Sequence, residues 1–173
     1  MTKRLSAILR LALVSVSLMA SVIDANADKF TNTDLGGNLK DYKVKFDEWL
    51  KSGERVVING YCGSGCAAVV VVIPRDRLCA IKGAALIYHG IMHYENNSLW
   101  PEANAWFLSV LPADFKSWMI KNRALESVQG KPMTGADLES RIQRCEEPLY
   151  STPLAQPKDA KTKRIIEKIM LTR

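Results

Sequence analysis

Beyond its first 27 residues, the sequence lacks any uncharged apolar run long enough to cross a membrane. The early run at residues 11–23 is shorter than the 18 or so residues expected of a spanning helix. It follows Lys3, Arg4 and Arg10 and leads to a small-residue pattern ending at Ala27, which is typical of a secretory signal peptide. There is no cysteine near Ala27, so the sequence does not indicate a lipid anchor. We therefore expect this segment to be cleaved off, leaving a periplasmic or secreted protein with no stable membrane span.

A basic face of the kind that binds nucleic acid is also missing. After residue 27 the chain carries 21 basic and 17 acidic residues, and residues 157–173 alone account for this excess of four positive charges. The body of the protein is therefore close to neutral, which argues against nucleic acid as a partner. Residues 151–173 form a basic C-terminal tail. Its segment "KRIIEKIM" is compatible with a short amphipathic helix, but we favour a solvated, frayed terminus.

The sequence contains neither internal repeats nor low-complexity segments, and residues 28–150 are enough for one domain with a hydrophobic core. Helical and strand-like apolar spacings alternate along them. We expect a helix ending at Gly53, strands in "RVVING" and "RLCAIKGAALIYHG", two helices separated by Pro112, and a third helix begun by Thr134. This order predicts an α/β fold in which a parallel sheet is flanked by helices.

Only four cysteines are present, Cys62, Cys66, Cys79 and Cys145. In an oxidising compartment an even number predicts two disulfides, and the sequence leaves all three pairings open. At least one bridge is expected to brace the turn between Cys62 and Cys66. A zinc site at this pair is the alternative, but no second close pair of cysteines supports it. No metal or cofactor is predicted.

The segment "INGYCGSGCAA" puts Ser64 between two glycines, where a buried strand enters a helix. Sites form at such strand ends in parallel sheets, and the next amide, that of Gly65, can donate to an oxyanion. The two glycines are also explained by the turn alone. Two familiar motifs fail here: no Lys-Ser or Lys-Thr pair follows, as a phosphate loop requires, and the Gly-x-Ser-x-Gly pattern of the α/β-hydrolases is not formed.

Two further features accompany Ser64. His89 ends the segment "ALIYHG", so it should emerge at the same sheet edge, and Gly36-Gly37 precede Ser64 by about one helix and one strand. The order of "DLGG", "INGYCGSGCAA" and "RLCAIKGAALIYHG" resembles the Clp protease and crotonase superfold. A closer resemblance is to exported bacterial Clp-like proteins with a Cys-x-Ser-x-Cys segment, a cysteine in the next strand and a late Arg-Cys. It covers roughly residues 34–145, and relative to that fold the domain is N-terminally truncated.

The resemblance implies a serine hydrolase acting on a peptide or acyl substrate. Ser64 would be the nucleophile, His89 the base, and the amides of Gly37 and Gly65 the oxyanion donors. Proteins of this superfold commonly form homo-oligomers. Four aromatic residues of the later helices either form such a contact surface or pack on the sheet in place of the missing elements: Trp100, Trp106, Phe107 and Trp118.

The acid that would orient His89 is less defined. Asp137 falls near the right region of the chain, with Glu146 and Glu147 as rivals, and a first-turn helix acid is the structural alternative for Asp137. For His89 the structural alternative is a partly buried histidine that hydrogen-bonds to the backbone. His93 is expected to be a loop residue beside the cleft rather than a metal ligand, because a glycine interrupts the helical pattern. Two functions remain: a serine hydrolase, and a non-catalytic binding or assembly module on the same fold.

Overall fold

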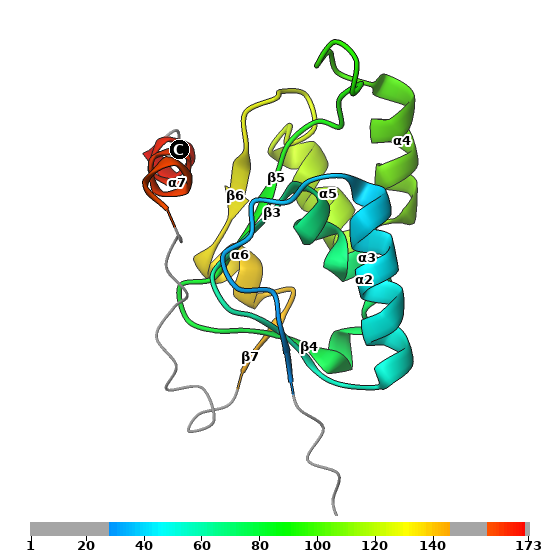
Figure 1. Cartoon of the computed structure of the whole chain (residues 1–173), viewed down its shortest axis with the longest axis vertical. Coiled ribbons are helices and arrows are strands. Elements are labelled where there is room, and N and C mark those ends of the chain that lie inside the picture. Colours follow the sequence, from blue (N-terminus) through cyan, green and yellow to red (C-terminus); the bar gives the residue numbers. More distant parts are fainter. Residues whose placement is uncertain (1–27, 146–158, 172–173) are drawn as a thin grey trace, which may run out of the picture.

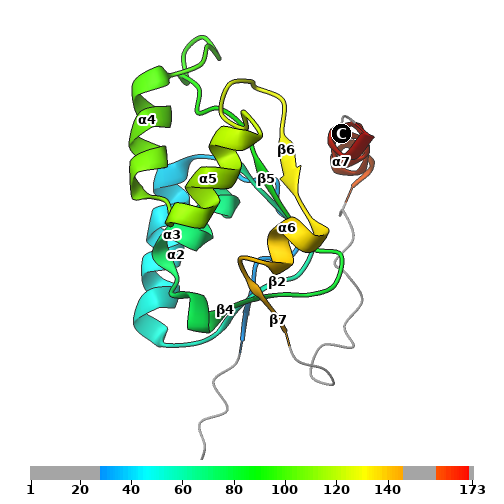
Figure 2. The ribbon, with the colours of Figure 1, turned by 180° about the vertical axis from the view of Figure 1, so that it is seen from behind.

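The computed structural model describes residues 28–145 and 159–171, and it is a mixed α/β fold in which a parallel sheet is flanked by helices (Figure 1). This confirms the predicted fold class at that level. Both views show α2, α3, α4 and α5 on one side of the strands and α7 on the other (Figures 1 and 2). Within the described residues, no helix is both long and apolar enough to cross a bilayer. The predicted signal peptide lies outside these residues.

The first sheet has four parallel strands in the order β1-β2-β4-β7. They are β1 (Lys29–Phe30), β2 (Val56–Ile58), β4 (Leu78–Ala80) and β7 (Gln143–Arg144). All three side chains of β2 are fully buried, which explains why this strand reads as a continuous apolar run rather than an alternating one. The sequence predicted β2 and β4, whereas the two-residue edge strands β1 and β7 carried no detectable pattern.

The second sheet has the order β3-β5-β6 and continues two strands of the first. Its members are β3 (Tyr61–Gly63), β5 (Ala85–Tyr88) and β6 (Lys131–Met133). Only residues 59–60 separate β2 from β3, and residues 81–84 separate β4 from β5, so the same chain segments pass from one sheet into the next. Strands β3 and β5 are parallel, and β6 is antiparallel to β5. The carboxyl ends of β3 and β5 therefore meet at one edge.

Local sequence signals set the helix boundaries before the site. Helix α2 (Leu39–Ser52) begins at Asn38, whose side-chain oxygen accepts the Lys40 N–H, and ends at Gly53 in the left-handed conformation. The Ser64 turn leads into the 3-10 helix η1 (Ser64–Ala68) and then the short helix α3 (Val69–Val72). Helix α2 packs across both of these elements. It thereby covers the turn that contains Ser64.

The later helices confirm one prediction and correct another. Helices α4 (Pro101–Val110) and α5 (Ala113–Lys121) are separated at Pro112, as expected. The helix expected from Thr134 is only the five-residue α6 (Gly135–Glu139), because the chain then extends into β7 beside β4. Of the four aromatic residues, two are buried and two exposed: Phe107 and Trp118 pack in the core, while Trp100 and Trp106 are 42% and 53% exposed.

The C-terminal tail differs from the solvated terminus that we favoured. Residues Ala160–Leu171 form helix α7, which lies beside β6 in both views (Figures 1 and 2). Ile166 is only 4% exposed, and a methyl group built on Gly130 would lie 3.2 Å from Ile169 Cδ1. One side of the amphipathic segment is thus packed against the domain through Ile166 and Ile169, because burial of Ile166 outweighs fraying.

Candidate active site

Ser64 occupies a strained turn immediately after β3. Its φ angle is 50°, in the left-handed region that side chains other than glycine seldom adopt. The residue is half-buried, so its hydroxyl is not sealed inside the core. Strain of this kind persists only where the surrounding structure enforces it, and it is concentrated at functional sites. Asn32, Asn97 and Arg123 share this conformation, so the φ angle supports a role for Ser64 only together with the position of the residue at the strand end.

A disulfide closes the chain around Ser64. Cys62 and Cys66 are bonded to each other, both are fully buried, and the bridge spans the whole Gly-Ser-Gly turn. The second disulfide joins Cys79 of β4 to Cys145, which follows β7. The prediction of two disulfides, one bracing the Ser64 turn, is confirmed, and no free cysteine remains. Disulfides persist in oxidising compartments, so both fit a secreted or periplasmic protein.

The Gly36-Gly37 turn lies directly against the Ser64 turn. A methyl group built on Gly36 would lie 2.6 Å from Ser64 Cβ and 2.8 Å from the Gly65 nitrogen. Gly36 has a φ angle of 87°, so both its conformation and its surroundings demand glycine. Gly37 is exposed to solvent, and its carbonyl oxygen would lie 2.9 Å from a methyl group built on Gly65. The two amides expected to act as oxyanion donors therefore belong to neighbouring turns.

His89 emerges at the same edge of the sheet as Ser64. Strands β3 and β5 are parallel neighbours, and Gly63 is paired with Ile87. Ser64 comes one residue after Gly63, and His89 comes two residues after Ile87. His89 is half-buried, and its Nδ1 lies 2.8 Å from the Gly90 carbonyl oxygen. A carbonyl can only accept, so Nδ1 carries the proton. Nε2 is then the basic nitrogen of the neutral ring.

The three side chains of the expected catalytic triad are not hydrogen-bonded to one another in the described part of the chain. Among the described residues, no hydrogen bond links Ser64 Oγ to His89, and none links His89 to Asp137. The Asp137 carboxylate is 61% exposed and lies 3.7 Å from the Arg141 guanidinium. Glu146 and Glu147, the rival acids, lie outside the described residues. The contact that fixes the tautomer of His89 is thus the backbone carbonyl of Gly90.

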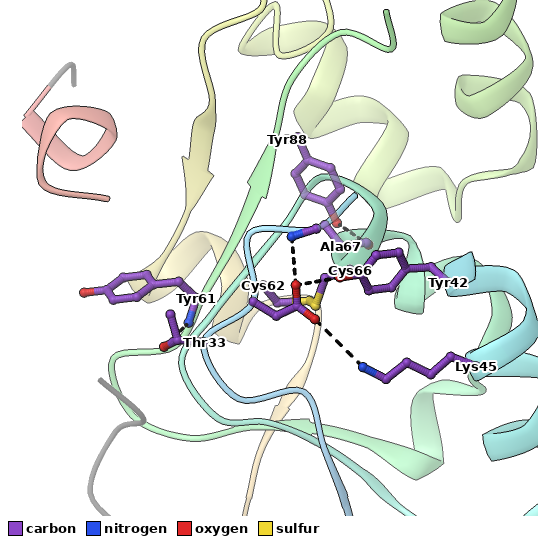
Figure 3. Close-up of a disulfide and its surroundings, with 10 residues drawn as sticks. Thr33, Tyr42, Lys45, Tyr61, Cys62, Cys66, Ala67 and Tyr88 are labelled. Atoms are coloured by element: carbon purple, nitrogen blue, oxygen red, sulfur yellow. Dashed lines mark hydrogen bonds and ion pairs between the residues drawn. A yellow bond between two sulfur atoms is a disulfide. The ribbon is translucent and has the colours of Figure 1, made fainter. Parts of the chain in front are cut away.

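Sequence reasoning missed a polar group behind the Gly36 turn, shown in Figure 3. The Oδ1 atom of Asp34 accepts the Gly36 N–H at 2.8 Å and the Tyr42 O–H at 2.5 Å. Lys45 Nζ lies 3.8 Å from the other carboxylate oxygen. Burial of the Tyr42 ring, together with the neighbouring Asp34 carboxylate, raises the pKa of its hydroxyl above the usual value. The spacing Asp34-x-Gly36 is the signal that could have revealed this group, because an Asp side chain often accepts a hydrogen bond from the backbone N–H two residues later in the chain.

A pocket of about 390 Å³ lies beside this polar group. It is lined by residues 30–35 and by Lys45, Asp159 and Thr162, so it shares Asp34 and Lys45 with the polar group but does not include Ser64. His93 lies in the loop after β5, where its ring stacks on Trp100 with centroids 4.7 Å apart. Across the described ranges, no three His, Cys, Asp or Glu side chains gather closely enough to hold a metal ion.

The site therefore combines a serine on a strained turn, a histidine at the adjacent strand end and two apposed glycine turns. These groups are the components of nucleophilic acyl transfer. No protein-family model matches the sequence, and no curated protein matches it.

Proposed function

We propose that this protein is an exported serine hydrolase of the Clp and crotonase type, cleaving a peptide or another acyl substrate. The observation that carries the proposal is the left-handed Ser64 at the end of β3, held against the Gly36-Gly37 turn. The chain order of glycine turn, serine turn and histidine strand end supports the same assignment.

In the proposed reaction, Ser64 Oγ attacks the acyl carbon while His89 Nε2 takes its proton. The negative charge that develops on the acyl oxygen is held by the amides of Gly37 and Gly65. His89 then gives the proton to the leaving group, and water hydrolyses the acyl-enzyme by the same steps in reverse. The Gly90 carbonyl orients His89, the role that the sequence suggested for Asp137.

This reaction requires Ser64 Oγ and His89 Nε2 to approach to about 3 Å. Both residues are half-buried, and they follow paired positions of the neighbouring strands β3 and β5. Catalytic hydrogen bonds are often long or absent in enzymes without substrate and shorten when substrate binds. The missing Ser64–His89 hydrogen bond is therefore compatible with the proposal.

Labelling of the purified protein with a fluorophosphonate probe tests the nucleophile. We expect wild type to be labelled, Ser64→Ala to remain unlabelled, and His89→Gln to react about a hundredfold more slowly. Ser117→Ala, which changes an exposed serine on α5, is the matched control and should label like wild type. Equal labelling of wild type and Ser64→Ala, or none of either, would exclude Ser64 as the nucleophile.

A non-catalytic binding module is the second candidate. It is favoured by the position of Asp137, whose carboxylate lies by Arg141, and by the lack of a hydrogen bond between Ser64 Oγ and His89 in the described chain. In this case the Cys62–Cys66 bridge would shape a rigid peptide-binding turn. The two candidates give opposite results in the labelling experiment, because a binding module leaves the probe unreacted while still retaining peptides on a column.

A further inference from the structure

Asp34 connects three parts of the chain beside the Ser64 turn through its backbone and its carboxylate. The backbone of Asp34 pairs with β3: its N–H donates to the Tyr61 carbonyl at 2.7 Å, and its carbonyl accepts the Gly63 N–H at 2.8 Å. Its side chain accepts from the Gly36 amide and from the Tyr42 hydroxyl (Figure 3). Asp34 thus ties the glycine turn both to the strand that carries Ser64 and to helix α2.

The Tyr42 ring lies against both glycines whose amides would hold the oxyanion. A methyl group built on Gly65 would lie 2.6 Å from Tyr42 Cδ2, and one built on Gly37 would lie 3.8 Å from Tyr42 Cε2. The ring therefore fills the space beside Gly65 that a side chain would otherwise take. Its hydroxyl is fixed by Asp34, so ring and carboxylate act as one unit.

The same contacts decide which amide can serve as a donor. The Gly36 N–H is engaged by Asp34 and is unavailable to a substrate. The following amide, that of Gly37, belongs to an exposed residue and comes directly after the left-handed Gly36. Lys45 completes the group, with its ammonium 3.8 Å from Asp34 and 4.8 Å from the Trp49 ring centroid.

We propose that Asp34 and Tyr42 are positioning residues that hold the Gly37 and Gly65 amides in one fixed oxyanion-binding arrangement. The proposal rests on the function proposed above. Donors that are fixed before the reaction cost no reorganisation when charge develops, which is why such preorganisation contributes strongly to catalysis. Asp34 and Tyr42 do not touch substrate. They act through the two glycine turns.

The rate of fluorophosphonate labelling at saturating probe tests this role. Tyr42→Phe keeps the ring but removes the hydroxyl, and Asp34→Ala removes the acceptor. Both are expected to lower the first-order rate constant by about tenfold or more, with an unchanged half-saturating probe concentration. Asp34→Asn should recover most of the rate, because its amide oxygen still accepts hydrogen bonds. The labelled fraction at completion separates misfolded protein from slow reaction.

Two control variants make the same kinds of substitution at positions outside the Asp34–Tyr42 pair. Tyr94→Phe alters a tyrosine that is 97% exposed, and Asp47→Ala removes a carboxylate from α2 that pairs with Lys43. Both should label at the wild-type rate. Wild-type rate constants in Tyr42→Phe and Asp34→Ala would overturn the proposal while leaving Ser64 as the nucleophile.

If wild type is not labelled, the proposed function fails, and a second measurement is needed to test the positioning role of Asp34 and Tyr42 on its own. The amide signals of Gly37 and Gly65 in ¹⁵N-labelled protein should move or broaden in Tyr42→Phe and Asp34→Ala, and stay in place in Asp47→Ala. Unmoved Gly37 and Gly65 signals in the first two variants would overturn the positioning role.

Discussion

Gly36 and Ser64 are in direct contact, and no side chain fits between them. A methyl group on Gly36 would lie 2.6 Å from Ser64 Cβ and 2.2 Å from the Gly63 carbonyl oxygen. Since the residue is also left-handed, we expect Gly36→Ala to lower the free energy of unfolding by about 3 kcal/mol. Denaturant unfolding measures this loss, and fluorophosphonate labelling should decline with it.

Gly53 supplies the matched control for Gly36. It too is left-handed, with a φ angle of 76°, but a methyl group there would have nothing within 4 Å. Gly53→Ala should therefore cost only the backbone strain, about 1 kcal/mol, and leave labelling unchanged. Equal losses in the two variants would show that the contact with Ser64 adds nothing.

The two disulfides should have separate effects on stability and on the site. The Cys79–Cys145 bridge closes a loop with a sequence separation of 66, and the Cys62–Cys66 bridge one of 4. Loop-closure entropy gives about 4 kcal/mol for the first and about 2 kcal/mol for the second. We expect paired alanine variants to follow this order in denaturant unfolding. Only loss of Cys62–Cys66 should abolish labelling of protein that remains folded.

Mass spectrometry of protein alkylated without reduction checks the premise of that prediction. We expect no alkylated cysteine, because both bridges consume all four thiols. Four alkylated cysteines would contradict the disulfides altogether. In the denaturant unfolding experiment, a larger loss of stability on removal of Cys62–Cys66 than on removal of Cys79–Cys145 would contradict the loop-entropy argument.

Helix α7 offers a test of its docking through two adjacent isoleucines. Ile166 is 4% exposed and Ile165 is 39% exposed. Ile166→Asp should release the helix at a cost of about 2 kcal/mol, so trypsin should cleave within α7 roughly thirtyfold faster. Ile165→Asp should change the rate of cleavage much less. Similar rates in both variants would contradict docking through Ile166.

Stability should fall at alkaline pH because of two tyrosines. Burial raises the pKa of the Tyr88 hydroxyl, and burial together with Asp34 raises that of Tyr42. Both stay protonated in the folded protein when their unfolded counterparts ionise near pH 10. Their contribution to stability is thus complete below about pH 10 and is lost above it. Denaturant midpoints at pH 8, 10 and 11 should fall less in Tyr42→Phe and Tyr88→Phe than in wild type or Tyr94→Phe.

Self-association is expected through the exposed aromatics of the helical half. Trp100 and Trp106 remain exposed, and exposed apolar patches often mark contact surfaces. Light scattering at micromolar concentration should detect an oligomer, which Trp106→Arg weakens and deletion of residues 157–173 does not. A monomer in every sample would refute the expectation, and an oligomer lost only with the tail would locate the surface at α7.

Sequence reasoning succeeded where the signal was local. The end of α2 at Gly53, the break between α4 and α5 at Pro112, and the position of Ser64 after a buried strand all follow from residue types within a few positions. The number of disulfides followed from an even cysteine count in an oxidising compartment. Their pairing did not, because it depends on which strands lie side by side.

Other features depended on tertiary contacts and left little trace in the sequence. Strand β7 is only two residues long and is defined by its pairing with β4, so a helical pattern was expected there. The docking of α7 depends on burial of Ile166 by the domain rather than on helix propensity. Asp34 and Tyr42 are eight residues apart and meet only because α2 folds back over the glycine turn.

The two bridges link cysteines that are consecutive along the chain: Cys62 to Cys66, and Cys79 to Cys145. A polypeptide that emerges N-terminus first therefore presents its thiols in the order in which they pair. The first bond can close as soon as Cys66 has emerged, four residues after Cys62. Cys79 then has no free thiol partner within the chain until Cys145 emerges. Simple oxidation in order of emergence thus yields the native connectivity, with no need for a disulfide isomerase to reshuffle an earlier bond.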